Sequence, residues 1–141
     1  MIYLDTNVIV YAIENHPKYG NACRKVLLDV ESNKLEVSSS IFILVELIGV
    51  LNKVNKILSN EKKATIKIEE NINAVLSYPI TWHDLNFTVI RKASEYKYKI
   101  RAADYIHIAT IELNGINKII SADSDFDEVK FMERIDPLDY K

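Results

Sequence analysis

The chain has 141 residues, enough for one ordinary domain with a sizeable hydrophobic core, so we expect a single domain over residues 1–141. Hydrophobic residues make up 48% of the sequence and charged residues 27%, and a formal net charge of -2 gives no overall attraction to a polyanion. No apolar run is long enough to span a membrane, the first residues lack a secretory signal, and the single cysteine excludes an internal disulfide, so we expect a cytoplasmic protein.

Apolar stretches of strand length alternate with helical stretches along the first half of the chain. They predict, in order, a strand over residues 1–4, helices over 8–13 and 17–33, a strand over 35–37, and a helix that ends near residue 56. Asp5 or Thr6 is suited to cap the first helix. Pro17 fits the first turn of the second helix, and Ser38–Ser40 are expected to cap the third.

The second half continues the same alternation. It predicts, in order, a helix opened by residues 59–60 and closed by Pro79, a strand over 80–82, helices over 84–98 and 102–113, and strands over 118–121 and 131–135. Asn114 and Gly115 are expected to end the last helix in a left-handed turn. Since strands that alternate with helices form parallel sheets covered on both faces, we predict a three-layer α/β fold, with a central, mostly parallel sheet of four to five strands flanked by helices.

Four acidic residues lie in apolar settings, where an ionised side chain is costly. Asp5 and Asp123 each follow a predicted strand, Glu46 lies within an apolar helix that we expect to be mostly buried, and Asp104 opens another apolar helix. An unpaired carboxylate in such a place costs several kcal/mol, or its pKa rises until the group is neutral. Each acid therefore needs a basic partner, backbone donors or a cation, and basic residues are scarce in these segments.

Convergence of these acids would create a metal site. The carboxyl ends of parallel strands meet at the edge where open α/β sheets bind ligands, so we expect Asp5 and Asp123 there. Together with Glu46 and Asp104 they would form an oxygen-only site suited to Mg²⁺ or Mn²⁺. Such a site favours phosphodiester hydrolysis by an activated water, because no other nucleophile is apparent. Taken singly, Asp5 and Asp104 also fit helix N-caps and Asp123 fits a turn, so the hypothesis depends on the four together.

Four short motifs occur in order along the chain: Ile2–Asn7, Val45–Leu47, Arg101–Ala109 and Ile119–Phe126. Together they resemble the PIN-domain family of ribonucleases, and most closely the toxins of VapBC toxin–antitoxin pairs. The resemblance places the four acids of the family on Asp5, Glu46, Asp104 and Asp123. The last motif also offers Asp125 and Asp127, of which we take Asp125 as an auxiliary metal ligand.

The resemblance implies more than the acids. It implies a central parallel sheet flanked by helices, hydrolysis of RNA with Mg²⁺ or Mn²⁺, assembly as a homodimer, and silencing by a small VapB-like antitoxin protein. Thr6, Asn7 and Ser121 correspond to polar positions that support the acids in this family. The resemblance does not identify the RNA or the cleavage site.

The basic segment before Asp104 would border the acidic site. Arg101 and Lys99 are candidates for binding phosphate groups of RNA, and Tyr98 could stack on a base. The alternative is a solvated helix end. His107 shares a helix face with Asp104, but apolar residues surround it, so we expect a packed or hydrogen-bonded core histidine rather than a ligand.

Other functions are open to the same pattern. The chain could be a PIN-like RNA-processing nuclease without an antitoxin, or a PIN-like binding module that no longer cleaves. A phosphatase of the haloacid dehalogenase type needs a second Asp at position 7, where this chain has Asn7, and a receiver domain needs paired acids after its first strand. The apolar residues over 41–51 exceed one core face, and could pack in a dimer, receive an antitoxin helix or fill a larger core.

Overall fold

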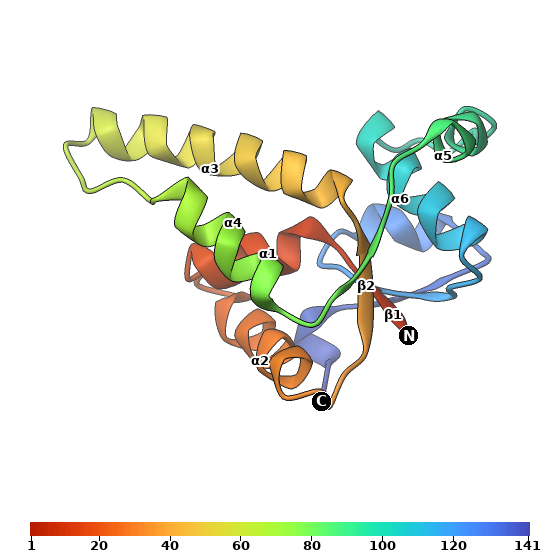
Figure 1. The fold of residues 1–141 in the computed structure, drawn as a ribbon, viewed down its shortest axis with the longest axis horizontal. Helices are drawn as coiled ribbons and strands as arrows, with labels where there is room; N and C mark the ends of the chain where they lie inside the picture. Colours follow the sequence, from red (N-terminus) through yellow and green to blue (C-terminus); the bar gives the residue numbers. More distant parts are fainter.

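Five strands form one sheet at the centre of the protein, in a computed structural model that describes residues 1–141 (Figure 1). The strands are β1 (Ile2–Leu4), β2 (Val37–Ser40), β3 (Thr81–His83), β4 (Lys118–Ile120) and β5 (Glu133–Ile135). They lie in the order β3-β2-β1-β4-β5, and every neighbouring pair is parallel. The chain therefore builds outward from β1 in one direction and then in the other, so that the order reverses between β1 and β4.

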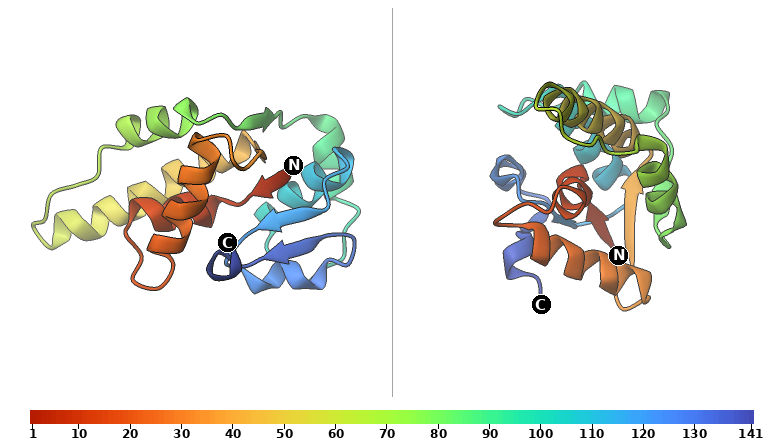
Figure 2. Two further views of the ribbon diagram at one scale, coloured as in Figure 1. Left: turned by 90° about the horizontal axis from the view of Figure 1, so that it is seen from below. Right: turned by 90° about the vertical axis from the view of Figure 1, so that its left-hand side faces the viewer.

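Helices cover both faces of this sheet, as predicted (Figure 2). They are α1 (Thr6–Ile13), α2 (Gly20–Glu31), α3 (Phe42–Asn60), α4 (Ile68–Ser77), α5 (Phe87–Ala93) and α6 (Ala102–Leu113), with short 3-10 helices η1 (Ser124–Glu128) and η2 (Pro137–Asp139). Helices α1 to α4 contribute to the larger hydrophobic core, on one face. Helix α6 and residues of η1 contribute to the core on the other face, and α5 packs against α6. The three-layer α/β prediction is confirmed.

Successive residues of the central strands fill the two cores alternately. Leu4 and Ile120 belong to the core beneath α1 to α4, whereas Tyr3 and Ile119 belong to the core beneath α6, and all four are fully buried. This alternation follows from the two-residue repeat of a strand, and strands buried on both faces become continuous apolar runs. Cys23 of α2 also lies in the larger core, where burial raises the pKa of its thiol to about 11.

The three consecutive serines lie in β2, and the prediction that they cap a helix is wrong. β2 pairs with β1 on one side and β3 on the other, and all four of its residues are buried. The small serine side chains fit this position between two strands, and the Ser39 hydroxyl donates to the carbonyl of Leu4. Ile41 is the N-cap of α3 and makes no side-chain cap, although Oγ of Ser40 accepts the N–H of Phe42, the first residue of the helix, at 3.1 Å.

The boundary between α3 and α4 also differs from the prediction. α3 continues to Asn60, and the Lys-rich segment 61–67 connects the two helices instead of opening the second one. Lys62 turns the chain with a φ of 56°. The side-chain amide of Asn55 then holds the returning chain, since it donates to the Ile66 carbonyl at 2.8 Å and accepts the Ile66 N–H at 2.7 Å. Such side-chain contacts with the backbone end helices where propensity alone would continue them.

Other helix ends are closer to expectation. α2 is shorter than predicted at both ends, and α5 begins after Asn86 rather than Asp84 and ends at Ala93, so residues 94–101 form no helix. Asn86 caps α5 by accepting the N–H of Val89 at 3.1 Å. α6 has the predicted bounds, and Gly115 after it has the predicted left-handed conformation, with φ +66°.

Helix α3 buries only one face, so the prediction that it is mostly buried is wrong. Ile43, Leu47 and Leu51 are fully buried, but Val45 is 62% exposed and Ile48 is 42% exposed. A larger core therefore does not account for the surplus of apolar residues on this helix. α3 extends away from the sheet, and the connection to α4 turns back at its far end (Figures 1 and 2). None of the helices combines the length and apolar character needed to cross a membrane.

Candidate active site

A cleft of about 550 Å³ lies at the carboxyl ends of β1 and β4. It is lined by Asp5 and one face of α1, by Glu46 and Val50 of α3, by Arg101, and by residues 122–124. This is the point at which the strand order reverses, and open α/β sheets bind ligands at that point. The cleft is therefore the candidate active site.

Asp5 enters the cleft from the end of β1, where it also caps α1. Its Oδ1 accepts a hydrogen bond from the N–H of Thr6 at 2.7 Å. Its Oδ2 accepts hydrogen bonds from the side-chain amide of Asn7 at 3.0 Å and the hydroxyl of Ser121 at 2.6 Å. Burial raises the pKa of Asp5, and the charge of His107 together with the hydrogen bonds from Ser121 and Thr6 offsets part of that rise. The chain thus fixes both oxygens of Asp5, and Asn7 and Ser121 support this acid directly.

Glu46 reaches the cleft from α3 and is held by two side chains. The hydroxyl of Thr6 donates to its Oε1 at 2.8 Å, and Nε2 of His107 lies 2.5 Å from the same oxygen. Burial raises the pKa of Glu46, but the hydrogen bond and charge of His107 lower it by more, so the carboxylate is ionised. His107 is fully buried and hydrogen-bonded, as predicted. Its partner is one of the four acids, which the sequence did not reveal.

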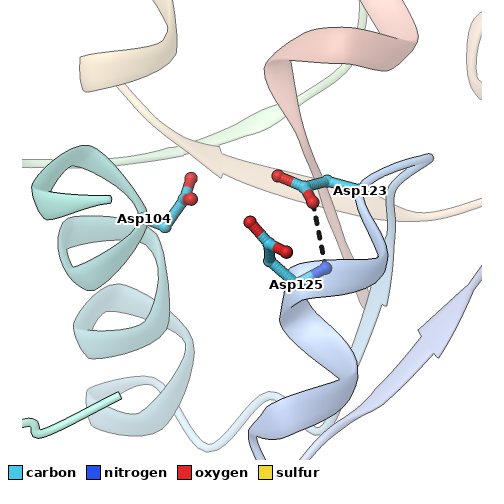
Figure 3. Close-up of side chains that lie close together, drawn as sticks. All are labelled: Asp104, Asp123 and Asp125. Atoms are coloured by element: carbon cyan, nitrogen blue, oxygen red, sulfur yellow. Dashed lines mark hydrogen bonds between the residues drawn. The ribbon is translucent and has the colours of Figure 1, made fainter. Parts of the chain in front are cut away.

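A second group of carboxylates converges at the start of α6 and η1 (Figure 3). One oxygen each of Asp104, Asp123 and Asp125 lies within 4.8 Å of the others. Asp123 accepts the N–H of Asp125 at 2.9 Å, whereas the buried Oδ2 of Asp104 has no hydrogen-bond partner. Burial raises the pKa of Asp104 to about 6, with Arg101 acting in the opposite direction. Asp127 does not join this group, because it pairs with Arg134.

Arg101 is the basic residue of the cleft, but it does not satisfy Asp104. Its Nε lies 3.6 Å from Oδ2 of Asp104 and its terminal nitrogen 4.0 Å from Oδ2 of Asp123, separations too long for hydrogen bonds. Its side chain is 74% exposed, whereas the side chain of Asp104 is only 3% exposed, so Arg101 leaves the buried carboxylate without a hydrogen bond. Oxygen-only donors with one buried, unpartnered carboxylate oxygen fit a hard divalent cation, and Mg²⁺ and Mn²⁺ prefer such donors.

Comparison with protein families decides what kind of protein carries this cleft. The model of the PIN domain matches residues 2–132, nearly the whole chain. The chain belongs to the PIN domain family. PIN domains form a family of nucleases, hydrolases that act on nucleic acids. A search of curated proteins found no match to the sequence.

Solved structures share this PIN fold over almost their full length. VapC20 from Mycobacterium tuberculosis, described as a toxin that cleaves the sarcin-ricin loop, is 16% identical and aligns over 94% of this chain and 98% of its own, with a TM-score of 0.73. A chain of VapBC2 from Rickettsia felis, bound to a promoter DNA fragment, is 20% identical over 96% and 98% with a TM-score of 0.68. A chain of a toxin–antitoxin complex from Klebsiella pneumoniae is 16% identical and aligns over 97% of this chain and 98% of its own, with a TM-score of 0.66. At these identities the likeness establishes the fold alone.

The structure brings the predicted acids of this PIN domain together. Asp5, Glu46 and Asp123 line the cleft with Arg101, and Asp104 and Asp125 join Asp123. Lys99 and Tyr98, the other two candidates for RNA binding, lie outside the cleft. Lys99 is exposed and donates its backbone N–H to Glu128 at 3.3 Å, and the half-buried ring of Tyr98 lies 5.6 Å from that of Tyr96. Neither lines the cleft, and their role in RNA binding stays a prediction.

Sequence reasoning missed residues on two sides of the site. Tyr11 and Glu14 line the cleft, and their spacing of four and seven residues from Asn7 on one helix face could have revealed them. Tyr3 lies behind the site, where its hydroxyl contacts His107 at 2.6 Å. No local signal marks Tyr3, because its place in an apolar strand indicates only a core residue.

Proposed function

We propose that this PIN domain is a ribonuclease that hydrolyses phosphodiester bonds with Mg²⁺ or Mn²⁺. The observation that carries the proposal is the buried Oδ2 of Asp104, which has no hydrogen bond and lies beside two more carboxylates. Arg101, whose Nε lies 3.6 Å away, offsets part of this buried negative charge, and a divalent cation shared with Asp123 and Asp125 would offset the rest. Asp5 and Glu46 contribute further carboxylates to the same cleft.

The cation, when bound, would polarise a phosphoryl oxygen and lower the pKa of the attacking water. The residues of the chain position and shield this chemistry. Asp5 is held in one orientation by Asn7 and Ser121, and Arg101 offsets the negative charge of a phosphate that enters the cleft. The hydroxyls of Thr6 and Ser121 already donate to carboxylates, which favours water over a side chain as the nucleophile.

The biochemical test uses purified protein and a labelled mixture of RNA oligonucleotides. We expect cleavage with Mg²⁺ or Mn²⁺ that stops with EDTA and is lost in Asp5→Asn, which keeps its shape and can still cap α1. Asp139→Asn makes the same change at an exposed site in η2 and should cleave like the wild type. Wild-type activity in Asp5→Asn, or in the presence of EDTA, would contradict the proposal.

We also propose that the protein is the toxin of a VapBC-type pair, bound in the cytoplasm by a VapB-like antitoxin and assembled as a homodimer. Structures of similar fold include toxin–antitoxin complexes, and one is a toxin that cleaves the sarcin-ricin loop. Apolar surface supports partners: the exposed Val45 and Ile48 of α3, and an apolar groove of about 340 Å³ between α1, α2 and α4. An RNA-processing enzyme without antitoxin is the alternative.

Expression in a bacterial host separates these two roles. A toxin should arrest growth, Asp5→Asn should not, and the product of the neighbouring reading frame should relieve the arrest and co-purify with the protein. Arrest by Asp5→Asn at wild-type strength would show that toxicity does not come from cleavage. Active cleavage without arrest or a binding neighbour would favour the processing enzyme.

A further inference from the structure

A buried chain of hydrogen bonds leads from the sheet to Glu46. The backbone N–H of Ser40 donates to the hydroxyl oxygen of Tyr3 at 3.1 Å, and this hydroxyl lies 2.6 Å from Nδ1 of His107. Nε2 of the same imidazole lies 2.5 Å from Oε1 of Glu46. Four elements contribute one residue each: β2, β1, α6 and α3.

The direction of these hydrogen bonds follows from the donors available. An ionised Glu46 can only accept, so Nε2 of His107 carries a proton and donates it. The Tyr3 oxygen accepts the N–H of Ser40. Nδ1 of a neutral imidazole would receive the Tyr3 proton, whereas Nδ1 of a charged imidazolium would donate to the second lone pair of the Tyr3 oxygen. In both charge states Nε2 carries the proton that Glu46 accepts.

The packing around the imidazole prevents it from turning. Tyr3 and His107 are both 0% exposed. The ring of Tyr3 lies 5.6 Å from that of His107, and the ring of Phe42 lies 5.8 Å from it on the α3 side. Two polar side chains in such a core are unfavourable unless their hydrogen bonds are made, and an apolar pair would fill the space without that condition. Their hydrogen bonds lead to an acid of the cleft.

The two oxygens of Glu46 differ as a result. Oε1 receives both the Thr6 hydroxyl and the His107 N–H, whereas Oε2 makes no hydrogen bond with the chain. The side chain is 20% exposed and lines the cleft. Fixing Oε1 leaves Oε2 as the oxygen available to a ligand in the cleft.

We propose that Tyr3 and His107 are positioning residues that hold Oε1 of Glu46, so that Oε2 is presented to the divalent cation. The inference rests on the proposed function, because it concerns the cation of that site. Side chains that orient a metal ligand typically change metal affinity about 10- to 100-fold when they are replaced. We call the chain of hydrogen bonds from Ser40 through Tyr3 and His107 to Glu46 the relay. The relay therefore predicts an effect on cation binding that is separate from any effect on the stability of the fold.

Calorimetry with Mn²⁺ on the full-length protein tests the relay. We expect His107→Leu to weaken Mn²⁺ binding about 10-fold or more, and His107→Gln to restore part of the affinity because its amide N–H can donate to Glu46. Tyr3→Phe, which removes one oxygen from a buried ring, should weaken binding about 3- to 10-fold and carries the test if His107→Leu does not fold. Tyr140→Phe is the matched control, since it removes a hydroxyl that donates to Asp29 at 2.8 Å, outside the cleft.

A double variant distinguishes positioning from general destabilisation. Tyr3→Phe should have no further effect on the Mn²⁺ affinity of Glu46→Gln, because the relay acts only through that carboxylate. Unchanged Mn²⁺ affinity in Tyr3→Phe and His107→Leu, with only the melting temperature lowered, would overturn the relay but leave the proposed nuclease intact. An equal effect of Tyr3→Phe in the Glu46→Gln background would also overturn it. A wild-type protein that binds no Mn²⁺ would overturn both proposals.

Discussion

The carboxylates of the cleft fall into two groups that the chain treats differently. Asp5 and Glu46 receive hydrogen bonds from surrounding side chains and backbone, so their orientation is set by the fold. In the other group, Asp104 and Asp125 have no such anchors, and Asp104 keeps a buried oxygen without a partner. The difference indicates that the first group is organised in advance, whereas the second needs something from solution to become stable.

The largest effects should come from removing charge in either group. Glu46→Gln and Asp104→Asn should each lower the rate of RNA cleavage about 1000-fold, because residues that act as a unit in catalysis fail together. Asp125→Asn should lower it about 10-fold at most, since this side chain is exposed and auxiliary. Single-turnover kinetics with one RNA oligonucleotide would measure these rates. A cleavage rate that falls as far in Asp125→Asn as in Asp104→Asn would remove the distinction between a ligand and an auxiliary.

Cation binding should act through the second group of carboxylates, Asp104, Asp123 and Asp125, and stabilise the folded protein. At a free Mn²⁺ concentration about 100-fold above Kd, binding to the folded state adds about 2.7 kcal/mol to the free energy of unfolding, which raises the melting temperature by several degrees. Asp104→Asn should lose most of this increase. Differential scanning calorimetry with and without Mn²⁺ measures it, and an equal increase in the variant would place the cation elsewhere.

In EDTA, Asp104 and Glu46 should respond in opposite ways to loss of charge. Asp104 has a folded-state pKa of about 6, above the ordinary value of 3.8, so the folded protein binds this proton more tightly than the unfolded chain does. The contribution of Asp104 to stability is therefore lost as pH rises through 6. Asp104→Asn should melt at a higher temperature than the wild type at pH 7.5, and this advantage should shrink toward pH 5. Glu46→Gln should melt at a lower temperature than the wild type at pH 7.5, because the hydrogen bond and charge of His107 outweigh burial and lower the pKa of Glu46 in the folded protein.

The smallest effects should concern RNA affinity. Arg101→Gln should weaken binding of an RNA oligonucleotide several-fold in low salt, and the loss should diminish as salt rises, since one phosphate contact is screened. Lys99→Gln should change affinity less, because Lys99 does not line the cleft. Fluorescence anisotropy with the inactive Asp5→Asn variant measures both. Equal losses for the two variants would extend the RNA-binding surface along the segment before α6.

Local patterns were sufficient for much of the fold. The apolar runs at β1 and β4, the bounds of α6 and the left-handed Gly115 follow from side-chain periodicity and backbone sterics. The end of α3 was not predictable in this way, since the contact between Asn55 and Ile66 depends on the path of the chain after the helix. Burial of α3 was overestimated because an apolar sequence does not specify which neighbour covers each face.

The acids of the site were recognisable because ionised groups in apolar segments need an explanation. Their partners were not recognisable. His107 lies 61 residues from Glu46 and 104 residues from Tyr3 in sequence, so nothing local connects these three side chains. The sequence therefore indicated which carboxylates matter, and the fold was needed to tell which are anchored and which are open.

The buried thiol of Cys23 is a natural reporter of local opening of the fold. Alkylating reagents attack the thiolate, and a pKa of about 11 together with complete burial keeps that form scarce and inaccessible in the closed state. Alkylation of Cys23 therefore requires α1 and α2 to separate transiently from the sheet. Because the chain has no second cysteine, the rate of alkylation would measure how often that layer opens, without any engineered probe.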